Sequence, residues 1–331
     1  MKKSVTIAAA IVLSAIITSS LISSTASNLT VSQAQASSKY PMTITNCGSK
    51  FTLAKMPERV VSLYSVTTEL MLRLGLEKKI VAAANFGEAM PTDLEPAYKA
   101  LNLIGKDFII PKEVLLSQRP DFVMDNQPDY FYDAKQGFAT RAEILAAGAQ
   151  TYTISAKCEN RASKGSLEDV YRDLRNIGRI FNVEAKAAAV IREMSKKIAE
   201  VRTRVAGKKA LKVMIFDAGE GPLGVFGPGS YDYVLRLAGG QNAFSDLKLN
   251  YEQVSVESVA TREIDVVIVA EYDEKTAERI AFIKKTFPNL SAVKNNRVVA
   301  VPYGLMNPGV RNHLGVEAFA KAIFPNAFKP Q

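Results

Sequence analysis

Short apolar runs rich in β-branched residues alternate with amphipathic segments through most of this 331-residue chain. Strands that alternate with helices in this way form βαβ units around a parallel sheet. The pattern predicts strands at 60–63, 80–83, 122–124, 151–154, 213–216, 265–270 and 297–301. It predicts helices at 68–74, 112–117, 141–147, 231–237, 276–286 and 316–323. We therefore expect an α/β fold with mainly parallel sheets flanked by helices.

A long helical stretch divides this pattern into two similar sets. Apolar residues recur there at intervals of three and four, at Ala187, Val190, Ile191, Met194, Ile198 and Val201. This spacing gives a helix one buried stripe. A helix over 184–205 spans roughly 30 Å at about 1.5 Å per residue, the width of a small domain. We expect an N-terminal α/β lobe at 37–183, a linking helix at 184–206 and a C-terminal α/β lobe at 207–331.

The first 36 residues have the order of a secretory signal. Two lysines precede an apolar stretch at 5–22, and a polar run ends in the small-x-small tripeptide Ala34-Gln35-Ala36. A transmembrane anchor is the alternative, but serine and threonine dilute the apolar stretch. We expect cleavage after Ala36 and a soluble protein outside the cytoplasm. Because no cysteine lies near that point, we expect no lipid anchor, which suits a periplasm better than a Gram-positive surface.

The chain contains two cysteines, Cys47 and Cys158. In an oxidising compartment two cysteines are expected to form a disulfide. Two buried free thiols are the alternative, and a metal site built on two cysteines alone is a weaker one. Closing so long a loop stabilises a fold by about 4 to 5 kcal/mol in the chain-entropy model.

The chain is basic, with a formal net charge of +9. The charge of residues 37–331 is +7, because the first 36 residues hold two lysines and no acidic residue. A positive balance favours anionic partners. Export argues against nucleic acid, and the basic residues are scattered rather than clustered with aromatic residues. An anionic small molecule, or simply a soluble surface, remains.

A glycine pattern at 219–224 formally matches the dinucleotide motif G-x-G-x-x-G. Pro222 and the glycine-rich residues that follow predict a loop where the motif requires a helix. An exported protein also rarely meets a dinucleotide. A loop at the mouth of a ligand cleft is the better interpretation.

Catalytic motifs are absent from the sequence. It contains no G-x-S-x-G and no H-E-x-x-H, and His313 is its only histidine. Sites for bare zinc or manganese need several imidazoles, so direct metal binding is not expected, and His313 reads as a residue near a helix start or the surface. Carboxylate-pair chemistry stays open, which leaves a secreted hydrolase as the alternative of another class.

Two segments, 113–124 and 257–268, resemble each other in outline. Each places a glutamate, Glu113 or Glu257, eight residues before an aspartate that leads into a predicted strand. The echo suggests two lobes of similar build. Complementing a helix dipole would explain either glutamate equally well.

Segments across nearly all of the mature chain resemble one family. They are PERVVSL at 57–63, TTELMLRLGLEKKIV at 67–81, the segment 113–124, LRLAGGQN at 235–242, VSVE at 254–257 and PGVR at 308–311. In their order and spacing they are similar to the periplasmic binding proteins for ferric siderophores and cobalamin, which serve ATP-driven (ABC) importers. The resemblance implies two α/β lobes joined by one long helix, with a ligand cleft between them and little hinge motion. It also implies that Glu113 and Glu257 dock onto arginines of a membrane permease.

The loops after the predicted strands should line this cleft, since ligands lie beyond the carboxyl ends of parallel strands. These loops are rich in aromatic side chains, which suit chelate rings or a macrocycle. They also offer basic side chains that suit chelate carboxylates. The candidates are Tyr64, Phe86, Tyr130, Phe131, Tyr132, Phe226, Tyr231, Tyr272 and Tyr303, with Lys106, Arg141 and Arg311.

A chelate that brings its own metal ligands needs only a cleft, aromatic walls and a countercharge. We expect a ferric siderophore, because the chain is basic and many such chelates are anionic; cobalamin or haem is the alternative. The protein should work as a monomer, without a cofactor of its own and without catalysis. Its partner should be the membrane permease of an ABC importer, with a sensor as the other possibility.

Overall fold

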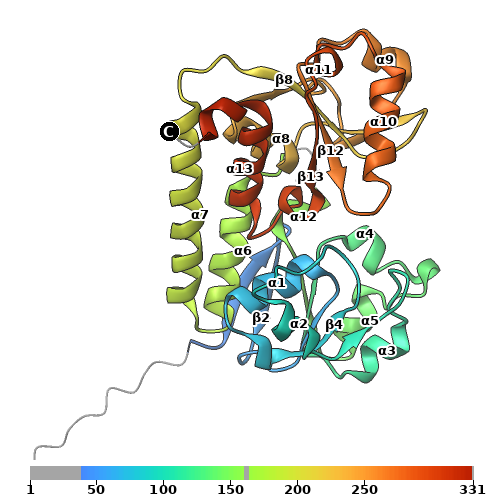
Figure 1. The fold of residues 1–331 in the computed structure, drawn as a ribbon. Helices are drawn as coiled ribbons and strands as arrows, with labels where there is room; N and C mark the ends of the chain where they lie inside the picture. Colours follow the sequence, from blue (N-terminus) through green and yellow to red (C-terminus); the bar gives the residue numbers. More distant parts are fainter. Residues whose placement is uncertain (1–38, 160–163, 330–331) are drawn as a thin grey trace, which may run out of the picture. The chain divides into compact units, whose positions relative to one another are not determined.

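Two large β-sheets covered by helices, and a separate two-stranded hairpin, form the described part of the chain, residues 39–159 and 164–329 of a computed structural model (Figure 1). The expected signal segment 1–36 lies outside these residues. The expected fold class, two α/β lobes with mainly parallel sheets, is confirmed by the strand order and pairing. Of the helices in the described ranges, none is both long and apolar enough to span a membrane.

The first lobe contains a sheet that is parallel throughout, in the order β5-β4-β3-β6-β7. Its strands are β3 (Val60–Ser62), β4 (Ile80–Ala84), β5 (Leu103–Ile104), β6 (Phe122–Asp125) and β7 (Gln150–Thr153). Its helices are α1 (Ser65–Arg73), α2 (Glu95–Lys99), α3 (Lys112–Ser117), α4 (Pro128–Phe131) and α5 (Arg141–Ala146). The sequence pattern missed β5, α2 and α4, which are too short to show a period.

The second lobe contains a mixed sheet in the order β11-β9-β8-β12-β13, with β10 also paired to β8. Its strands are β8 (Leu211–Phe216), β9 (Leu223–Phe226), β10 (Gly240–Asn242), β11 (Tyr251–Val254), β12 (Val266–Glu271) and β13 (Val298–Pro302). Its helices are α8 (Ser230–Leu237), α9 (Val256–Ala260), α10 (Thr276–Thr286), α11 (Ser291–Lys294), α12 (Tyr303–Met306) and α13 (Asn312–Ile323). Strands β9 and β11 are antiparallel to their neighbours and were not expected.

The glycine pattern at 219–224 forms the turn between β8 and β9. Gly219 and Gly221 take positive φ angles of 98° and 150°, and a Cβ on Gly219 would lie 2.3 Å from the carbonyl oxygen of Pro222. The turn is followed by an antiparallel strand. A dinucleotide site needs a helix at that point, so the geometry of this turn does not fit a dinucleotide-binding motif.

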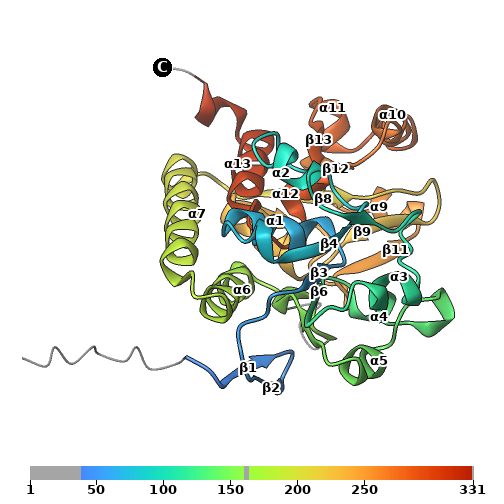
Figure 2. The same cartoon turned by 90° about the horizontal axis from the view of Figure 1, so that it is seen from below.

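Helices α6 (Leu167–Ile180) and α7 (Glu184–Val205) connect the two sheets along the chain. The break between them falls at Asn182, which has a positive φ of 55°. Helix α7 has the bounds expected from its apolar spacing and packs against both α6 and α13 (Figures 1 and 2).

Both sheets contribute to one apolar core that also contains α6, α7 and α13. Side chains alternate between faces along each strand, so Val213 and Ile215 of β8 face this shared core while Met214 faces a core private to the second lobe. In the first lobe Met124 and Val123 divide in the same way. Separating the lobes would expose apolar surface from the shared core, which favours little hinge motion.

A hairpin of β1 (Met42–Asn46) and β2 (Ser49–Leu53) precedes the first sheet. The expected disulfide is present: Cys47 in its turn is bonded to Cys158, with the two Cα atoms 5.1 Å apart. The side chain of Asn46 also exchanges two hydrogen bonds with the backbone of Thr153, at 2.7 and 2.9 Å. The hairpin is therefore fastened to the end of β7.

Candidate ligand-binding cleft

A cavity of about 390 Å³ lies where the carboxyl ends of strands from both lobes meet. The first lobe lines it with Tyr64, Glu88 and Phe108. The second lobe lines it with Asp217, Glu271, Tyr272, Tyr303 and Arg311. We call this cavity the interlobe cleft. Such an edge of parallel strands is where α/β folds hold ligands.

The lining residues of the second lobe stand at the ends of its central strands. Asp217 directly follows β8, Glu271 is the last residue of β12, and Tyr303 directly follows β13. These three strands are neighbours in the sheet. Their parallel register, with Val269 of β12 opposite Phe216 of β8, brings the side chains to one edge.

Aromatic rings from each lobe form two facing groups. In the first lobe the ring of Phe86 lies 6.4 Å from that of Tyr64 and 5.2 Å from that of Phe108. In the second lobe Tyr303 lies 6.0 Å from Tyr272 and 6.1 Å from Tyr231. The cleft thus has flat apolar walls with phenol hydroxyls among them, a surface suited to a ring-rich ligand.

The cleft tyrosines are neutral hydrogen-bonding groups. Burial is the main cause that raises the pKa of Tyr64 and of Tyr303 well above the usual value for a phenol. The hydroxyl of Tyr303 lies 2.8 Å from that of Tyr231, which in turn donates to the Asn307 amide oxygen at 3.3 Å. These phenols can offer hydrogen bonds to a ligand, and burial opposes their use as phenolate ligands.

Polar contacts join the lobes below the cleft. Arg311 of the second lobe contacts Glu69 of α1 at 2.7 Å and donates to the Ala89 carbonyl oxygen at 3.2 Å. The side-chain amide of Asn307 donates to Glu88 at 2.5 Å. Glu69 and Arg311 are largely buried, with side-chain exposures of 3% and 13%. A buried ion pair and hydrogen bonds therefore join the two lobes beneath the cleft.

The structure brings four of the sequence candidates to the cleft: Tyr64, Tyr272, Tyr303 and Arg311. Phe86, Phe226 and Tyr231 pack directly behind them. Glu88, Phe108, Asp217 and Glu271 line the cleft but were not among the candidates. The signal for Asp217 and Glu271 was available, since each is a carboxylate at the end of a buried strand.

The remaining candidates lie elsewhere in the first lobe. Arg141 donates to the hydroxyls of Thr151 and Thr153, at 3.0 and 2.7 Å, and lies over the Tyr132 ring at 4.3 Å. Tyr132 is buried and donates to Asp125 at 2.7 Å. Tyr132 is held inside the lobe and Arg141, whose side chain is 38% exposed, lines a separate hollow beside the β1–β2 hairpin, so we do not carry them into the proposed ligand site.

Tyr130 and Lys106 do not line the cleft themselves and act on it only through neighbouring residues. Tyr130 packs on Phe131 and Phe138, with ring centroids 5.3 and 5.2 Å away. The backbone of Lys106 exchanges hydrogen bonds of 3.0 and 2.9 Å with that of Ile109. This tight turn presents Phe108, whose side chain is 50% exposed.

Glu113 and Glu257 lie at equivalent positions of the two lobes. Each is exposed and stands in the first turn of a short helix, α3 or α9. Hydrogen bonds from its own backbone N–H and from Ser255 lower the pKa of Glu257, so it stays ionised. Neither residue lines the interlobe cleft.

His313 lies in the first turn of α13, and its Nδ1–H donates a hydrogen bond to the Val310 carbonyl oxygen at 3.0 Å. Burial lowers the pKa of this imidazole. Within the described ranges, histidine, cysteine, aspartate and glutamate form no group of three or more that could hold a metal ion.

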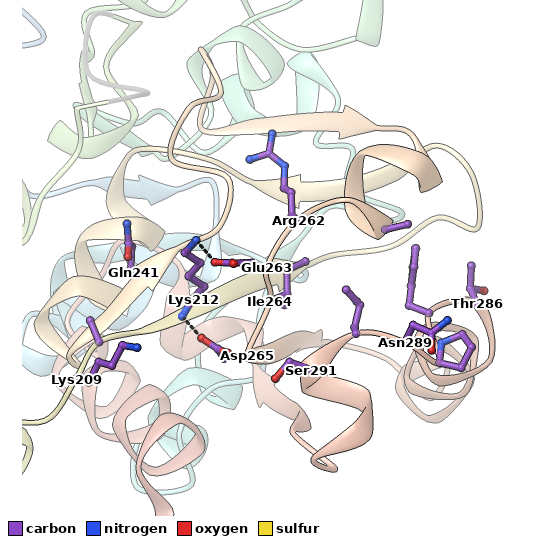
Figure 3. A pocket seen from close by; sticks show the side chains of 15 residues that line it. Lys209, Lys212, Gln241, Arg262, Glu263, Ile264, Asp265, Thr286, Asn289 and Ser291 are labelled. Atoms are coloured by element: carbon purple, nitrogen blue, oxygen red, sulfur yellow. Dashed lines mark hydrogen bonds and ion pairs between the residues drawn. The ribbon is translucent and has the colours of Figure 1, made fainter.

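A second hollow of about 740 Å³ lies at the amino ends of β8 and β12, the opposite edge of the same sheet (Figure 3). Most of its charged groups pair with protein partners: Lys212 Nζ lies 2.5 Å from Glu263, and the Lys212 backbone N–H donates to Asp265 at 2.9 Å. Arg262 pairs with Asp246 at 2.6 Å. With most of its charges paired and few aromatic side chains, this hollow is the weaker ligand site.

The chain is similar in sequence to known substrate-binding and vitamin-binding proteins. Over its whole length the chain is 23% identical to an uncharacterized ABC transporter substrate-binding lipoprotein of Bacillus subtilis, covering 99% of this chain and 100% of that protein. It is 24% identical to the vitamin B12-binding protein of Vibrio cholerae, over 76% of this chain and 83% of that protein.

Two solved structures share the fold. A periplasmic binding protein from Veillonella parvula superposes with a TM-score of 0.78 at 25% identity, covering 86% of this chain and 97% of that one. A protein of an ABC-type Fe³⁺-hydroxamate transport system from Saccharomonospora viridis superposes with a TM-score of 0.72 at 23% identity, covering 86% and 99%.

The family model for periplasmic binding proteins matches residues 60–303, a range that contains both sheets and most of the cleft. Members of this family bind transport substrates and are not enzymes. The secreted-hydrolase alternative is thereby overturned. The chain belongs to the periplasmic binding protein family and is a substrate-binding protein of ABC transport.

Proposed function

We propose that the protein captures an iron(III) siderophore-type chelate in the interlobe cleft and delivers it to the membrane permease of an ABC importer. The observation that carries this proposal is the cleft itself, whose walls combine Tyr64 and Phe108 of one lobe with Tyr272 and Tyr303 of the other. Such walls suit a chelate that brings its own metal ligands. The Fe³⁺-hydroxamate transport protein of similar fold supports the same class.

Cobalamin is the second candidate. It is favoured by the relative from Vibrio cholerae that is named a vitamin B12-binding protein. A corrinoid also presents a large flat ring with amide side chains, which aromatic walls and phenol hydroxyls can hold. Haem would suit the walls as well, but burial opposes a phenolate from Tyr64 or Tyr303 as its iron ligand.

Ligand binding is tested by native mass spectrometry against ferric citrate, hydroxamate and catecholate chelates, cobalamin and haem. We expect one class to bind with one ligand per chain. The chain contains no tryptophan and 12 tyrosines, so quenching of tyrosine fluorescence gives the affinities. If no chelate binds, or if a chelate is chemically converted, the proposal fails.

Replacing Tyr272 tests whether the aromatic wall holds the ligand. Tyr272→Ala removes a 49%-exposed ring from the cleft and should weaken binding about tenfold, since an aromatic contact contributes roughly 0.5 to 1.5 kcal/mol beyond its buried area. Leu249→Ala removes a 58%-exposed side chain of the same lobe outside the cleft lining, and should leave the affinity unchanged. Equal affinities for both variants would contradict the assignment.

The docking of Glu113 and Glu257 on permease arginines is also part of the proposal. Exposed carboxylates that meet arginines contribute to orientation and association rate. Glu113→Ala combined with Glu257→Ala should leave chelate affinity unchanged and abolish uptake by cells. Glu168→Ala combined with Glu278→Ala is the matched control, because both are exposed first-turn glutamates of other helices. Normal uptake by the Glu113/Glu257 variant would refute the docking role, and ligand binding without any uptake in the unmodified protein would point to a sensor.

Processing and domain limits complete the proposal. We take residues 37–183 and 207–331 as the lobes and 184–206 as their link. Signal cleavage after Ala36 should release a lipid-free monomer, although the relative in Bacillus subtilis is named a lipoprotein. The intact mass of the exported protein tests this point, because an acyl group would add to the mass of residues 37–331.

A further inference from the structure

The charge of the interlobe cleft is opposite to the charge of the chain. Although the formal net charge is +9, the described residues that line the cleft include three carboxylates, Glu88, Asp217 and Glu271, and one basic side chain, Arg311. The lysines and other arginines within residues 39–159 and 164–329 lie outside this lining. The local electrostatic field that acts on a ligand in the cleft is therefore not predicted by the net charge of the chain.

The basic side chains nearest the cleft have partners of their own. Arg311 contacts Glu69 at 2.7 Å, and that contact neutralises its charge beneath the cleft. Arg279 contacts Asp273 at 2.8 Å and lies over the Tyr272 ring at 4.4 Å. Because Arg311 and Arg279 pair with carboxylates outside the lining, while its own three carboxylates form no ion pair with a described residue, the net charge of the described lining is negative.

Lys157 is a third basic group near the cleft. It follows β7, and its ammonium lies 5.8 Å from the centre of the Tyr231 ring, behind the cleft wall. Burial lowers the pKa of Lys157, with the charge of Glu88 acting in the opposite direction. Lys157 does not line the cavity, so its ammonium, although it interacts with Glu88, is not among the charges that contact a ligand there.

Asp217 and Glu271 form the acidic side of the second lobe. They end two neighbouring parallel strands, β8 and β12, and so project from adjacent positions of one sheet edge. Burial is the main cause that raises the pKa of Asp217, while hydrogen bonds from Tyr251 and Tyr272 and the charge of Arg279 lower it. A partly desolvated carboxylate gains more from a positive countercharge than one in water does.

The aromatic walls favour the same sign of charge. The faces of tyrosine rings carry negative electrostatic potential and attract cations. Tyr64, Tyr272 and Tyr303 line the same cleft as the carboxylates. Carboxylates combined with aromatic faces attract a cation and repel an anion of the same size.

We propose that the interlobe cleft selects metal chelates with a net positive charge, and that Asp217 and Glu271 are the residues that impose this selection. The inference rests on the proposed function and adds the charge class of its ligand. It reverses the expectation of an anionic chelate that the basic composition suggested.

A charge series at constant shape tests the selection. The first series is a linear iron(III) trihydroxamate with a free terminal amine, its N-acetyl form and its N-succinyl form, which carry one positive, zero and one negative charge. The second series is aquocobalamin, cyanocobalamin and a cobalamin monocarboxylate, with the same three charges. In the series that binds, we expect affinity to fall by about tenfold for each unit of charge removed, the size of a screened interaction over several ångströms. Added salt should compress these ratios.

Isosteric variants assign the effect to residues. Asp217→Asn and Glu271→Gln should each reduce the cation-to-anion affinity ratio by about tenfold, and Glu271 is exposed, so its variant should fold normally. Glu263→Gln is the control: it removes the same charge from the same lobe at the opposite sheet edge. It should leave the ratio unchanged.

The outcomes separate the two proposals. Binding of the trihydroxamate series with no preference, or with a preference for the anion, overturns the charge selection and leaves the proposed function intact. Binding of the cobalamin series alone replaces the siderophore by the second candidate, and the charge preference within that series then decides the charge selection. A preference that persists in both carboxylate variants, or that Glu263→Gln also reduces, overturns the assignment to Asp217 and Glu271. Failure of both series to bind overturns the proposed function and the charge selection with it.

Discussion

Replacing both cysteines, Cys47→Ser with Cys158→Ser, is expected to lower the free energy of unfolding by about 4 to 5 kcal/mol. The bond joins residues separated by 111 positions in the sequence, and without it the unfolded chain regains the freedom that so long a closed loop removes. The loss is comparable to a large share of the total stability of an ordinary domain. It should show in denaturant unfolding as a lower midpoint.

The native contacts around the bond predict how the variant behaves. The hairpin keeps its two hydrogen bonds between Asn46 and Thr153, so the folded state should survive with its ligand affinity unchanged. The unmodified protein under reducing conditions is the matched control and should unfold at the same denaturant concentration as the double variant. An unfolding free energy within about 1 kcal/mol of the oxidised protein would contradict the entropic role.

The long elements of the fold could be predicted because their sequences carry a clear period. Helix α7 shows an apolar residue every three or four positions, and the central strand β12 begins with a continuous run of β-branched residues. Strands β9 and β11 escaped prediction for a physical reason: each is four residues long and pairs only through tertiary context, and glycine-rich turns flank β9. Sequence pattern therefore located the sheet centres better than the sheet edge.

The sequence predicted several of the residues that line the cleft, but it did not predict that carboxylates outnumber basic side chains there. The expectation that loops after strands carry the site led to Tyr64, Tyr272, Tyr303 and Arg311, all of which line it. It could not show that Arg141 turns back onto the threonines of β7, because side-chain direction depends on neighbours that only the fold supplies. The net charge of the chain is positive while carboxylates outnumber basic side chains in the described lining, because net charge averages over surfaces that a ligand never meets.

Replacing Arg311 with methionine should lower the free energy of unfolding by about 3 kcal/mol at neutral pH, because it leaves the buried carboxylate of Glu69 without its closest countercharge. The two groups lie 2.7 Å apart, with side-chain exposures of 13% and 3%. Methionine has a similar length and keeps the packing, so the loss reports chiefly the charge. Denaturant unfolding of the ligand-free protein measures it.

Arg73→Met is the matched control. Arg73 lies 3.7 Å from the same carboxylate, but its side chain is 30% exposed and it also pairs with Asp93 at the surface. Water screens its interaction with Glu69, so the expected loss is about 1 kcal/mol or less. A loss in Arg311→Met no larger than that in Arg73→Met would contradict the role of the buried pair.

The loss of unfolding free energy in Arg311→Met should also depend on pH, and the direction of that dependence identifies Glu69 as the group responsible. Burial is the main cause that raises the pKa of Glu69 above 4.5, and Arg311 and Arg73 act against it. A carboxyl with a raised pKa in the folded state contributes less to stability as pH rises from its unfolded pKa through its folded one. Removing Arg311 raises the folded pKa further and extends that decline to higher pH. The gap in unfolding free energy between the unmodified protein and Arg311→Met should therefore widen from acid to neutral pH, and combining the change with Glu69→Gln should abolish the pH dependence of that gap.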